Sequence, residues 1–324
     1  MDINMAYNKY LPEGRRFDTD ENLYYTSSLS GLERAKREGA ILEAYVDRCD
    51  EEKNTYVDLN GIKGVIPREE FMLTPDGEEV KSSVIANKVD QIVCFKVKYW
   101  EIDGTGYKAV LSRREAQEEC YNNYLSTLTP GDIIPATVTA FHNNSSYLDI
   151  GCGYSAMMTP DCFSISRVTS ASNHLYIKQE VHVVVKANDP ETRRFNVSIK
   201  ELLGTWEENA KLFTPGDTVP AYVSNIDEKN GVWIALAPNF QGLAEKIEDD
   251  PVLSNLQSGD RITVYIKSIN TSNEKVKLVI VSKSDRMVKK PPLKYYIDVD
   301  EVKHIDKWVY SPEESLKNTQ TIFE

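Results

Sequence analysis

The chain has 324 residues, of which 41% are hydrophobic and 27% charged, and its 38 basic and 50 acidic side chains give a formal net charge of −12. This length allows two or three domains, and the apolar fraction is sufficient for packed cores, which excludes wholesale disorder. No stretch approaches the roughly 20 apolar residues of a membrane helix, and the N-terminus lacks the apolar block of a secretory signal, so we expect a cytoplasmic protein without membrane contact. The acidic balance excludes a protein that coats nucleic acid through its overall charge, so any such binding must depend on local features.

The cysteines and histidines form no pattern of a metal site or of a nucleophile with its base. The cysteines are odd in number, scattered and without a C-x-x-C pair, which is typical of reduced structural thiols. They are Cys49, Cys94, Cys120, Cys152 and Cys162. We find no catalytic constellation, and therefore predict no enzyme, no metal and no small-molecule cofactor.

The first 38 residues form a leader with one clear helix signal. Ser30-Gly-Leu-Glu33 has the spacing of a capping box, which predicts that a helix starts there and ends near Gly39.

A unit that occurs three times dominates the rest of the chain. The copies open alike, with Gly39–Val46, Gly131–Val138 and Gly216–Val223. Sixteen or seventeen residues after each glycine an alternating strand carries an aromatic residue, which is Tyr56, Tyr147 or Trp233. Later each copy has an acidic or amide residue followed five residues on by a basic one, in the pairs Asp103 and Lys108, Asp189 and Arg194, and Asn270 and Lys275. This register indicates a true internal repeat.

The period of the repeat indicates a small domain rather than a solenoid unit. The copies begin 92 and 85 residues apart, whereas solenoid repeats span about 20–50 residues. Each copy contains about five short strands with period-two alternation. Five strands avoid two bare sheet edges by closing into a barrel, so we predict an all-β protein of three tandem five-stranded barrels.

Helical stretches separate the barrels and an aromatic tail follows them. Residues 113–128 and 200–213 are rich in helix formers and predict short connecting helices. In the tail, Ser311-Pro-Glu-Glu314 has the spacing of a second capping box. The predicted parts are a leader at 1–38, barrels at 39–114, 131–200 and 216–284, helical linkers at 115–130 and 201–215, and an aromatic tail at 285–324.

The repeat resembles the OB-fold repeat of the bacterial ribosomal protein S1 family. The likeness covers residues 39 to about 284 and rests on the opening glycine, the aromatic-Val-Asp-Leu strand, the Val-x-Val-Lys strand and the closing Leu-Ser-Arg-Arg at 111–114. The resemblance implies OB-type barrels that bind single-stranded messenger RNA at the small ribosomal subunit, with small-subunit proteins as further partners and without catalysis.

Positions that match the family's RNA-binding face follow from this resemblance. The second stacking aromatic of each copy is kept as Tyr56, Tyr147 or Trp233, and the acidic and basic positions hold Asp103 and Lys108, Asp189 and Arg194, and Asn270 and Lys275. The first aromatic position holds Lys53, Asn144 or Asn230, and the histidine position holds Pro67, Thr159 or Glu245, so each copy keeps about half of the set.

Two interpretations of these residues remain open. Exposed aromatics would stack on bases and neighbouring cations would contact phosphates, but a strand aromatic also packs locally and a surface lysine is also simply solvated. The middle barrel favours RNA, because residues 131–198 carry six acidic against five basic side chains and place Arg193 and Arg194 near Tyr147. Residues 1–130 carry 24 acidic and 17 basic side chains, which instead favours a ribosome-docking or scaffold protein whose barrels and aromatic tail contact other proteins.

Overall fold

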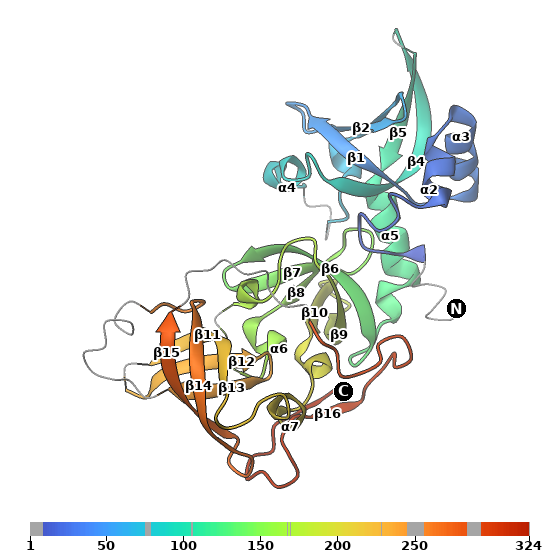
Figure 1. The fold of residues 1–324 in the computed structure, drawn as a ribbon. Coiled ribbons are helices and arrows are strands. Elements are labelled where there is room, and N and C mark those ends of the chain that lie inside the picture. The colour runs from blue at the N-terminus through green and yellow to red at the C-terminus, as the bar shows by residue number, and fades with distance from the viewer. Residues whose placement is uncertain are drawn as a thin grey trace.

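Three closed five-stranded barrels, numbered here in chain order, form the body of the protein (Figure 1). The computed structural model describes residues 9–74, 79–104, 106–166, 168, 170–227, 229–244, 256–283 and 293–323. In each barrel the strands close in the order first, second, third, fifth, fourth, and only the third and fifth strands run parallel. The predicted all-β architecture of closed barrels is confirmed, and it is consistent with OB-fold repeats.

The leader and barrel 1 come first in the described chain. Helices α2 (Asp20–Thr26) and α3 (Leu29–Glu38) precede the barrel. The strands are β1 (Leu42–Cys49), β2 (Thr55–Leu59), β3 (Ile62–Ile66), β4 (Ile92–Asp103) and β5 (Gly106–Ser112). The described residues between β3 and β4 include the short helices η1 (Arg68–Glu70) and α4 (Ser82–Ala86).

A linker helix leads into barrel 2. It comprises α5 (Arg113–Asn123) and the 3₁₀ turn η3 (Leu125–Thr127). The strands are β6 (Ile133–His142), β7 (Ser145–Asp149), β8 (Ser155–Met158), β9 (Glu180–Asp189) and β10 (Arg194–Ser198). Two short helical turns lie between β8 and β9, α6 (Pro160–Phe163) and η4 (Ala171–Asn173).

Barrel 3 follows a second, shorter linker made of η5 (Lys200–Leu203) and α7 (Trp206–Ala210). Its strands are β11 (Thr218–Asp227), β12 (Gly231–Ala237), β13 (Phe240–Ala244), β14 (Arg261–Asn270) and β15 (Lys275–Lys283). The C-terminal segment then forms a small hairpin of β16 (Lys307–Val309) and β17 (Gln320–Ile322).

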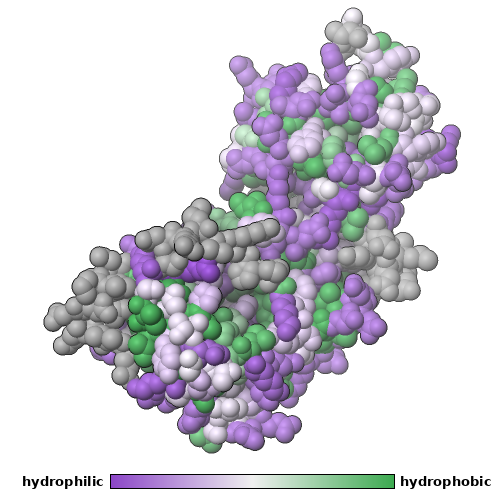
Figure 2. Space-filling view, in the orientation of Figure 1, coloured by the Kyte–Doolittle hydropathy of each residue, from purple (hydrophilic) through white to green (hydrophobic). Residues whose placement is uncertain are grey.

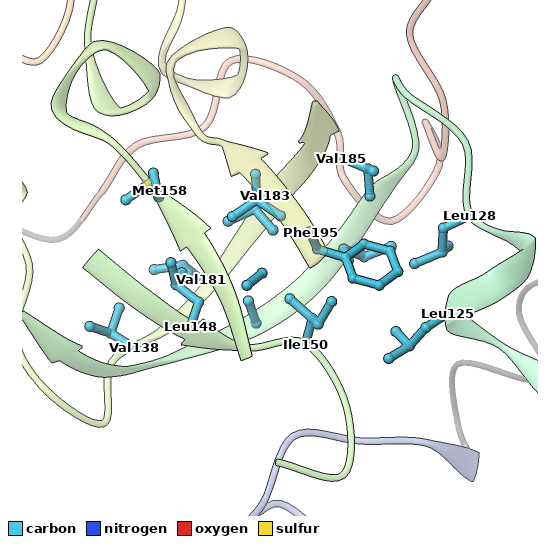
Figure 3. Close-up of a cluster of buried hydrophobic side chains, with 14 of the residues drawn as sticks. Leu125, Leu128, Val138, Leu148, Ile150, Met158, Val181, Val183, Val185 and Phe195 are labelled. Atoms are coloured by element: carbon cyan, nitrogen blue, oxygen red, sulfur yellow. The ribbon is translucent and has the colours of Figure 1, made fainter. Parts of the chain in front are cut away.

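The barrel interiors follow from the alternation of the strands. Val57 and Leu59 on β2, Leu148 on β7 and Ile150 directly after β7 are at most 2% exposed, as their positions beside the outward aromatics predict. The core of barrel 2 extends beyond its own strands, because Leu125 from the linker is part of the same buried cluster (Figure 3). The linker therefore closes one end of barrel 2 as well as connecting it to barrel 1.

The helix predictions are partly wrong. Helix α3 exists and ends at Gly39, where a left-handed φ of 66° suits glycine, but its N-cap is Ser28, not Ser30. The stretch 200–213 is broken by Gly204 into η5 and α7. At Ser311 no helix forms; its hydroxyl instead accepts a hydrogen bond from the Thr319 N–H across the C-terminal hairpin.

The leader joins barrel 1 to barrel 2 through a buried ion pair. The Glu13 carboxylate lies 2.7 Å from Nε of Arg113, at the start of α5, and 2.8 Å from Nζ of Lys88. Its backbone N–H donates to Asp149 of barrel 2, and its carboxylate accepts from the Cys94 N–H of barrel 1. Residues of the leader, the linker and both barrels thus meet around one carboxylate.

Burial gives these carboxyl groups unusual pKa values. Burial alone would raise the pKa of Glu13, but the charges of Arg113 and Lys88 outweigh it and hold that pKa well below its usual range. Burial and then the charge of Glu13 raise the pKa of Asp149 to about 6 and that of Glu43 to about 8. Glu43 is therefore protonated at neutral pH, and its Oε2 accepts hydrogen bonds from the backbone N–H groups of Gly14 and Arg16.

The C-terminal segment joins barrel 2 to the second linker. The Tyr310 ring is 1% exposed and its hydroxyl donates to Glu201 of η5 at 2.8 Å. The Tyr295 hydroxyl accepts from the His182 N–H on β9, and Nδ1 of His304 lies 2.7 Å from Asp132. The prediction that this tail contacts other proteins through its aromatic residues is therefore wrong for Tyr310, because its ring is buried within the chain.

Among the described residues, no helix is both long and apolar enough to cross a membrane.

Replacement of Arg113 with alanine should lower the free energy of unfolding by about 3–5 kcal/mol, because Glu13 would keep a buried charge without its main partner. Urea denaturation followed by circular dichroism measures the change. Arg34→Ala is the matched control, because it breaks an ion pair with Glu38 of similar length, 2.8 Å, on the solvent-exposed face of α3. If Arg113→Ala lowered the free energy of unfolding no more than Arg34→Ala does, the result would contradict a stabilising role of the buried pair of Arg113 and Glu13.

Replacement of Glu43 with glutamine should make stability less dependent on pH. The folded state raises the pKa of Glu43 from 4.5 to about 8. The contribution of Glu43 to the free energy of unfolding is therefore fully present below pH 4.5 and is lost as the pH rises toward 8. An amide stays neutral, so the variant should be more stable than the parent by about 1–3 kcal/mol at alkaline pH and similar to it at acidic pH. Urea denaturation of both proteins at each pH tests this, and a difference that is the same at both pH values would contradict it.

Candidate nucleic-acid interface

Barrel 3 places the predicted aromatic residue in a groove. Trp233 lies on β12, where it pairs with Leu243 on β13, and Leu243 in turn pairs with Lys277 on β15. These three neighbouring strands form one wall of a groove of about 510 Å³. The indole of Trp233 is partly exposed, but its Nε1 is buried and has no hydrogen-bond partner among the described residues. The part of the indole that is exposed to the groove is therefore its ring and not its N–H.

Several cations surround this aromatic residue. Lys275 opens β15, as the sequence predicts, and lines the groove together with Lys267, Lys277 and Lys317. Glu274 also belongs to the lining, and its carboxylate accepts a hydrogen bond from the Ser315 hydroxyl at 2.7 Å. The groove therefore combines an aromatic surface with a local excess of positive charge in an acidic protein.

Barrel 2 places Tyr147 on an outward row but separates it from Arg193. Tyr147 on β7 pairs with Met157 on β8, and Met157 pairs with Asn196 on β10, two residues from the exposed Arg194. Arg193 instead has a φ of 53°, and its guanidinium carbon lies 4.8 Å from the centre of the Tyr121 ring on α5. Arg193 thus packs against the linker, whereas Arg194 stays on the strand that carries the predicted face.

Barrel 1 keeps its aromatic residue in contact with its own side chains. The Arg48 guanidinium lies 3.7 Å from the centre of the Tyr56 ring, and the Tyr56 hydroxyl donates to Asp50 at 3.0 Å. Burial and this hydrogen bond raise the pKa of Tyr56. Lys108 forms an ion pair with Glu101 at 2.6 Å, while the side chain of Asp103 lies outside the described residues. A base could reach this ring face only by displacing Arg48 or by stacking on it.

The acidic and amide members of the predicted pairs stabilise turns. Asp189 accepts hydrogen bonds from the Thr192 hydroxyl and backbone, and these lower its pKa. Asn270 accepts from the Asn273 N–H at 3.0 Å in the corresponding turn of barrel 3. Each turn places the following basic residue, Arg194 or Lys275, at the start of the last strand.

The three residues at the family's first aromatic position lie in or beside turns. Lys53 and Asn144 have φ values of 71° and 66°, a backbone conformation that asparagine tolerates better than an aromatic residue. Asn230 donates from its amide to Asp227. Glu245, at the histidine position of barrel 3, lies outside the described residues.

Sequence reasoning missed three lysines of the barrel 3 groove, Lys267, Lys277 and Lys317. Lys277 follows Lys275 at a spacing of two on the same outward face, so strand alternation could have identified it. Lys317 comes from the C-terminal segment, and no local pattern signals its place. No group of three or more potential metal ligands occurs among the described histidine, cysteine, aspartate and glutamate residues.

The fold and the barrel 3 groove define a protein of tandem barrels consistent with OB-fold repeats. The resemblance to the bacterial ribosomal protein S1 family is confirmed by curated relatives. "Small ribosomal subunit protein bS1" of Staphylococcus aureus (strain COL) is 29% identical over 196 residues, 57% of this chain and 49% of that protein. The protein of the same name from Staphylococcus epidermidis is 28% identical over the same coverage. The chain thus spans about half the length of the curated relatives it matches.

Comparisons with family models and solved structures add little. No family model matches the chain. A multidomain protein with nucleic acid binding domains from Streptococcus pneumoniae covers 77% of this chain and 76% of its own, with 12% identity and a TM-score of 0.25. The alpha subunit of aIF2 from Pyrococcus abyssi covers 23% of this chain and 30% of its own, with 25% identity and a TM-score of 0.22. TM-scores this low do not indicate a shared arrangement of the whole chain.

Proposed function

We propose that the protein binds single-stranded RNA, in particular messenger RNA, through the outer faces of its barrels as part of the translation machinery, in association with small ribosomal subunit proteins and without catalysis. The observation that carries the proposal is the groove of barrel 3, where Trp233 lies beside four lysines in a protein with a net charge of −12. Similarity to proteins named small ribosomal subunit protein bS1 supports the same function.

The chemistry of the groove suits a flexible polyanion with flat bases. An indole face stacks on any base, and lysines attract phosphates with little dependence on sequence. Lys275 and Arg194 start the last strand of their barrels and Lys108 lies within the last strand of barrel 1, and each is a candidate phosphate contact near Trp233, Tyr147 and Tyr56. In this proposal Asp189 and Asn270 shape the turns before their strands, and Arg193 supports the middle barrel from the linker side.

The three barrels are not equivalent in this proposal. In barrel 1 the ring of Tyr56 is already covered by Arg48, and Lys108 is paired with Glu101. We expect the strongest RNA contact at barrel 3, a weaker one at the Tyr147 face of barrel 2, and the weakest at barrel 1. The affinity should fall as salt rises, because each lysine that contacts a phosphate releases condensed counterions, and the few lysines of the groove should give a modest slope.

A second candidate function, docking on other proteins, is favoured by barrel 1. Its β4–β5 hairpin exposes Tyr99, Ile102 and Tyr107, the second of them at 76%. Hydrophilic residues cover much of the visible face of barrel 1 in Figure 2. The exposed apolar side chains of the hairpin therefore offer a local surface for contact with another protein. A pull-down of small-subunit proteins that survives nuclease treatment and is lost in Ile102→Asp would support docking by barrel 1 and not RNA binding.

Fluorescence anisotropy with a labelled unstructured RNA at low salt tests the leading proposal. Trp233→Ala should weaken binding about tenfold and Tyr147→Ala less, because each removes one stacking surface worth roughly 1–3 kcal/mol. Tyr24→Ala is the control, since Tyr24 is an exposed aromatic residue on the leader helix α2, away from the barrel faces. Unchanged circular dichroism would exclude misfolding. The absence of salt-sensitive binding at protein concentrations on the order of 100 micromolar would contradict the proposal.

A further inference from the structure

The C-terminal segment forms part of the groove of barrel 3. The Leu316 N–H donates to the carbonyl of Ser272, in the loop between β14 and β15, at 3.1 Å. The Ser315 hydroxyl donates to the Glu274 carboxylate at 2.7 Å. These contacts hold residues 315–317 against the loop that precedes Lys275. Lys317 and Thr319 consequently line the same groove as Trp233.

The carboxylate that lines the groove is engaged within the protein, whereas the lysine beside it remains exposed to the groove. Glu274 is the carboxylate of the described lining, and its side chain is only 8% exposed. One of its oxygens accepts from Ser315, and the other lies 3.8 Å from Nζ of Lys317, a long ion-pair distance. The Lys317 side chain is itself 55% exposed. Glu274 is thus engaged in holding the segment, and the ammonium group of Lys317 retains access to a ligand in the groove.

The exposed part of the Trp233 ring adds a second requirement on the ligand. A phosphate chain alone would satisfy the lysines, but the partly exposed indole ring is matched by a flat group that can stack on it. Single-stranded RNA presents unpaired bases beside its phosphates, whereas the bases of a duplex are paired and stacked on each other.

We infer that barrel 3 and the C-terminal segment together build one composite site for single-stranded RNA, in which Lys317 contacts a phosphate and the Trp233 ring stacks on a base. This inference rests on the proposed function and deepens it, because it assigns the segment around Lys317 to the binding surface. The segment therefore has two tasks, since the same stretch of chain also packs on barrel 2 and the second linker.

Three variants separate the two contacts. Lys317→Ala removes the charge from the C-terminal wall, and Lys317→Arg keeps it. Trp233→Ala removes the stacking surface. Lys307→Ala is the control, because Lys307 is an exposed lysine on β16 of the same segment and does not line the groove.

The probes are a short fluorescein-labelled oligouridine and an abasic oligonucleotide of the same length. Anisotropy should show that Lys317→Ala weakens binding of both probes by about threefold to tenfold. Lys317→Arg should restore binding. Trp233→Ala should weaken binding of oligouridine by a similar factor and leave the abasic probe unaffected, and Lys307→Ala should bind both probes as the parent does.

The outcomes distinguish failure of this inference from failure of the proposed function. Failure of the unmodified protein to bind oligouridine would overturn the proposed function together with the inference. Normal binding that Trp233→Ala weakens and Lys317→Ala does not would overturn the composite site and leave RNA binding at barrel 3 intact. Equal weakening of both probes by Trp233→Ala would overturn the assignment of the indole ring to a base.

Discussion

The buried pair of Glu13 and Arg113 is the interaction on which the arrangement of the first two barrels depends. Its 2.7 Å contact joins the leader to the first residue of the linker helix, and both side chains are nearly inaccessible to water. A buried carboxylate requires a partner, because an isolated charge in a protein interior is strongly disfavoured. Lys88 and the Cys94 N–H complete its surroundings, so the leader, the linker and barrel 1 must fit together for the pair to form.

The two ends of the described chain act as braces between globular units. The leader braces barrel 1 against barrel 2, and the C-terminal segment braces barrel 2 and the second linker while it also contacts barrel 3. Figure 1 shows this segment running along the lower side of barrels 2 and 3. A row of barrels on flexible linkers would present its faces independently of each other. These braces instead hold neighbouring faces in a defined arrangement, which suits a ligand that extends along more than one barrel.

Local patterns predicted much of the fold, and they failed where partners are distant in sequence. Period-two alternation identified Val57 and Leu148 as inward residues, because strand geometry alone determines which face a residue occupies. The capping-box spacing at Ser311 was misleading, since its hydroxyl bonds to Thr319 across a hairpin instead of starting a helix. The pairing of Glu13 with Arg113 leaves no local signal, because a contact across a hundred residues depends on how whole barrels pack.

In the candidate site too, residues whose position follows from strand register were predictable, and residues placed by contacts between distant parts of the chain were not. The repeat predicted that Trp233 and Lys275 lie on strands, where the structure has them on β12 and at the start of β15, because both positions follow from the register of the strands. The packing of Arg193 on Tyr121 was not predictable, since it depends on a left-handed turn and on the position of α5 beside barrel 2. The contribution of Lys317 was equally hidden, because its segment reaches barrel 3 only after crossing barrel 2.

The position of the C-terminal brace in the chain has a consequence for synthesis. Domains generally fold as they emerge from the ribosome, beginning with the N-terminal one. Barrels 2 and 3 can therefore each close before residues 293–323 have been made, but the contacts of Glu201 with Tyr310 and of Asp132 with His304 form only after that segment has been synthesised. The mutual arrangement of these two barrels is thus set later than the folding of either barrel, and the groove beside Trp233 becomes complete at the same moment.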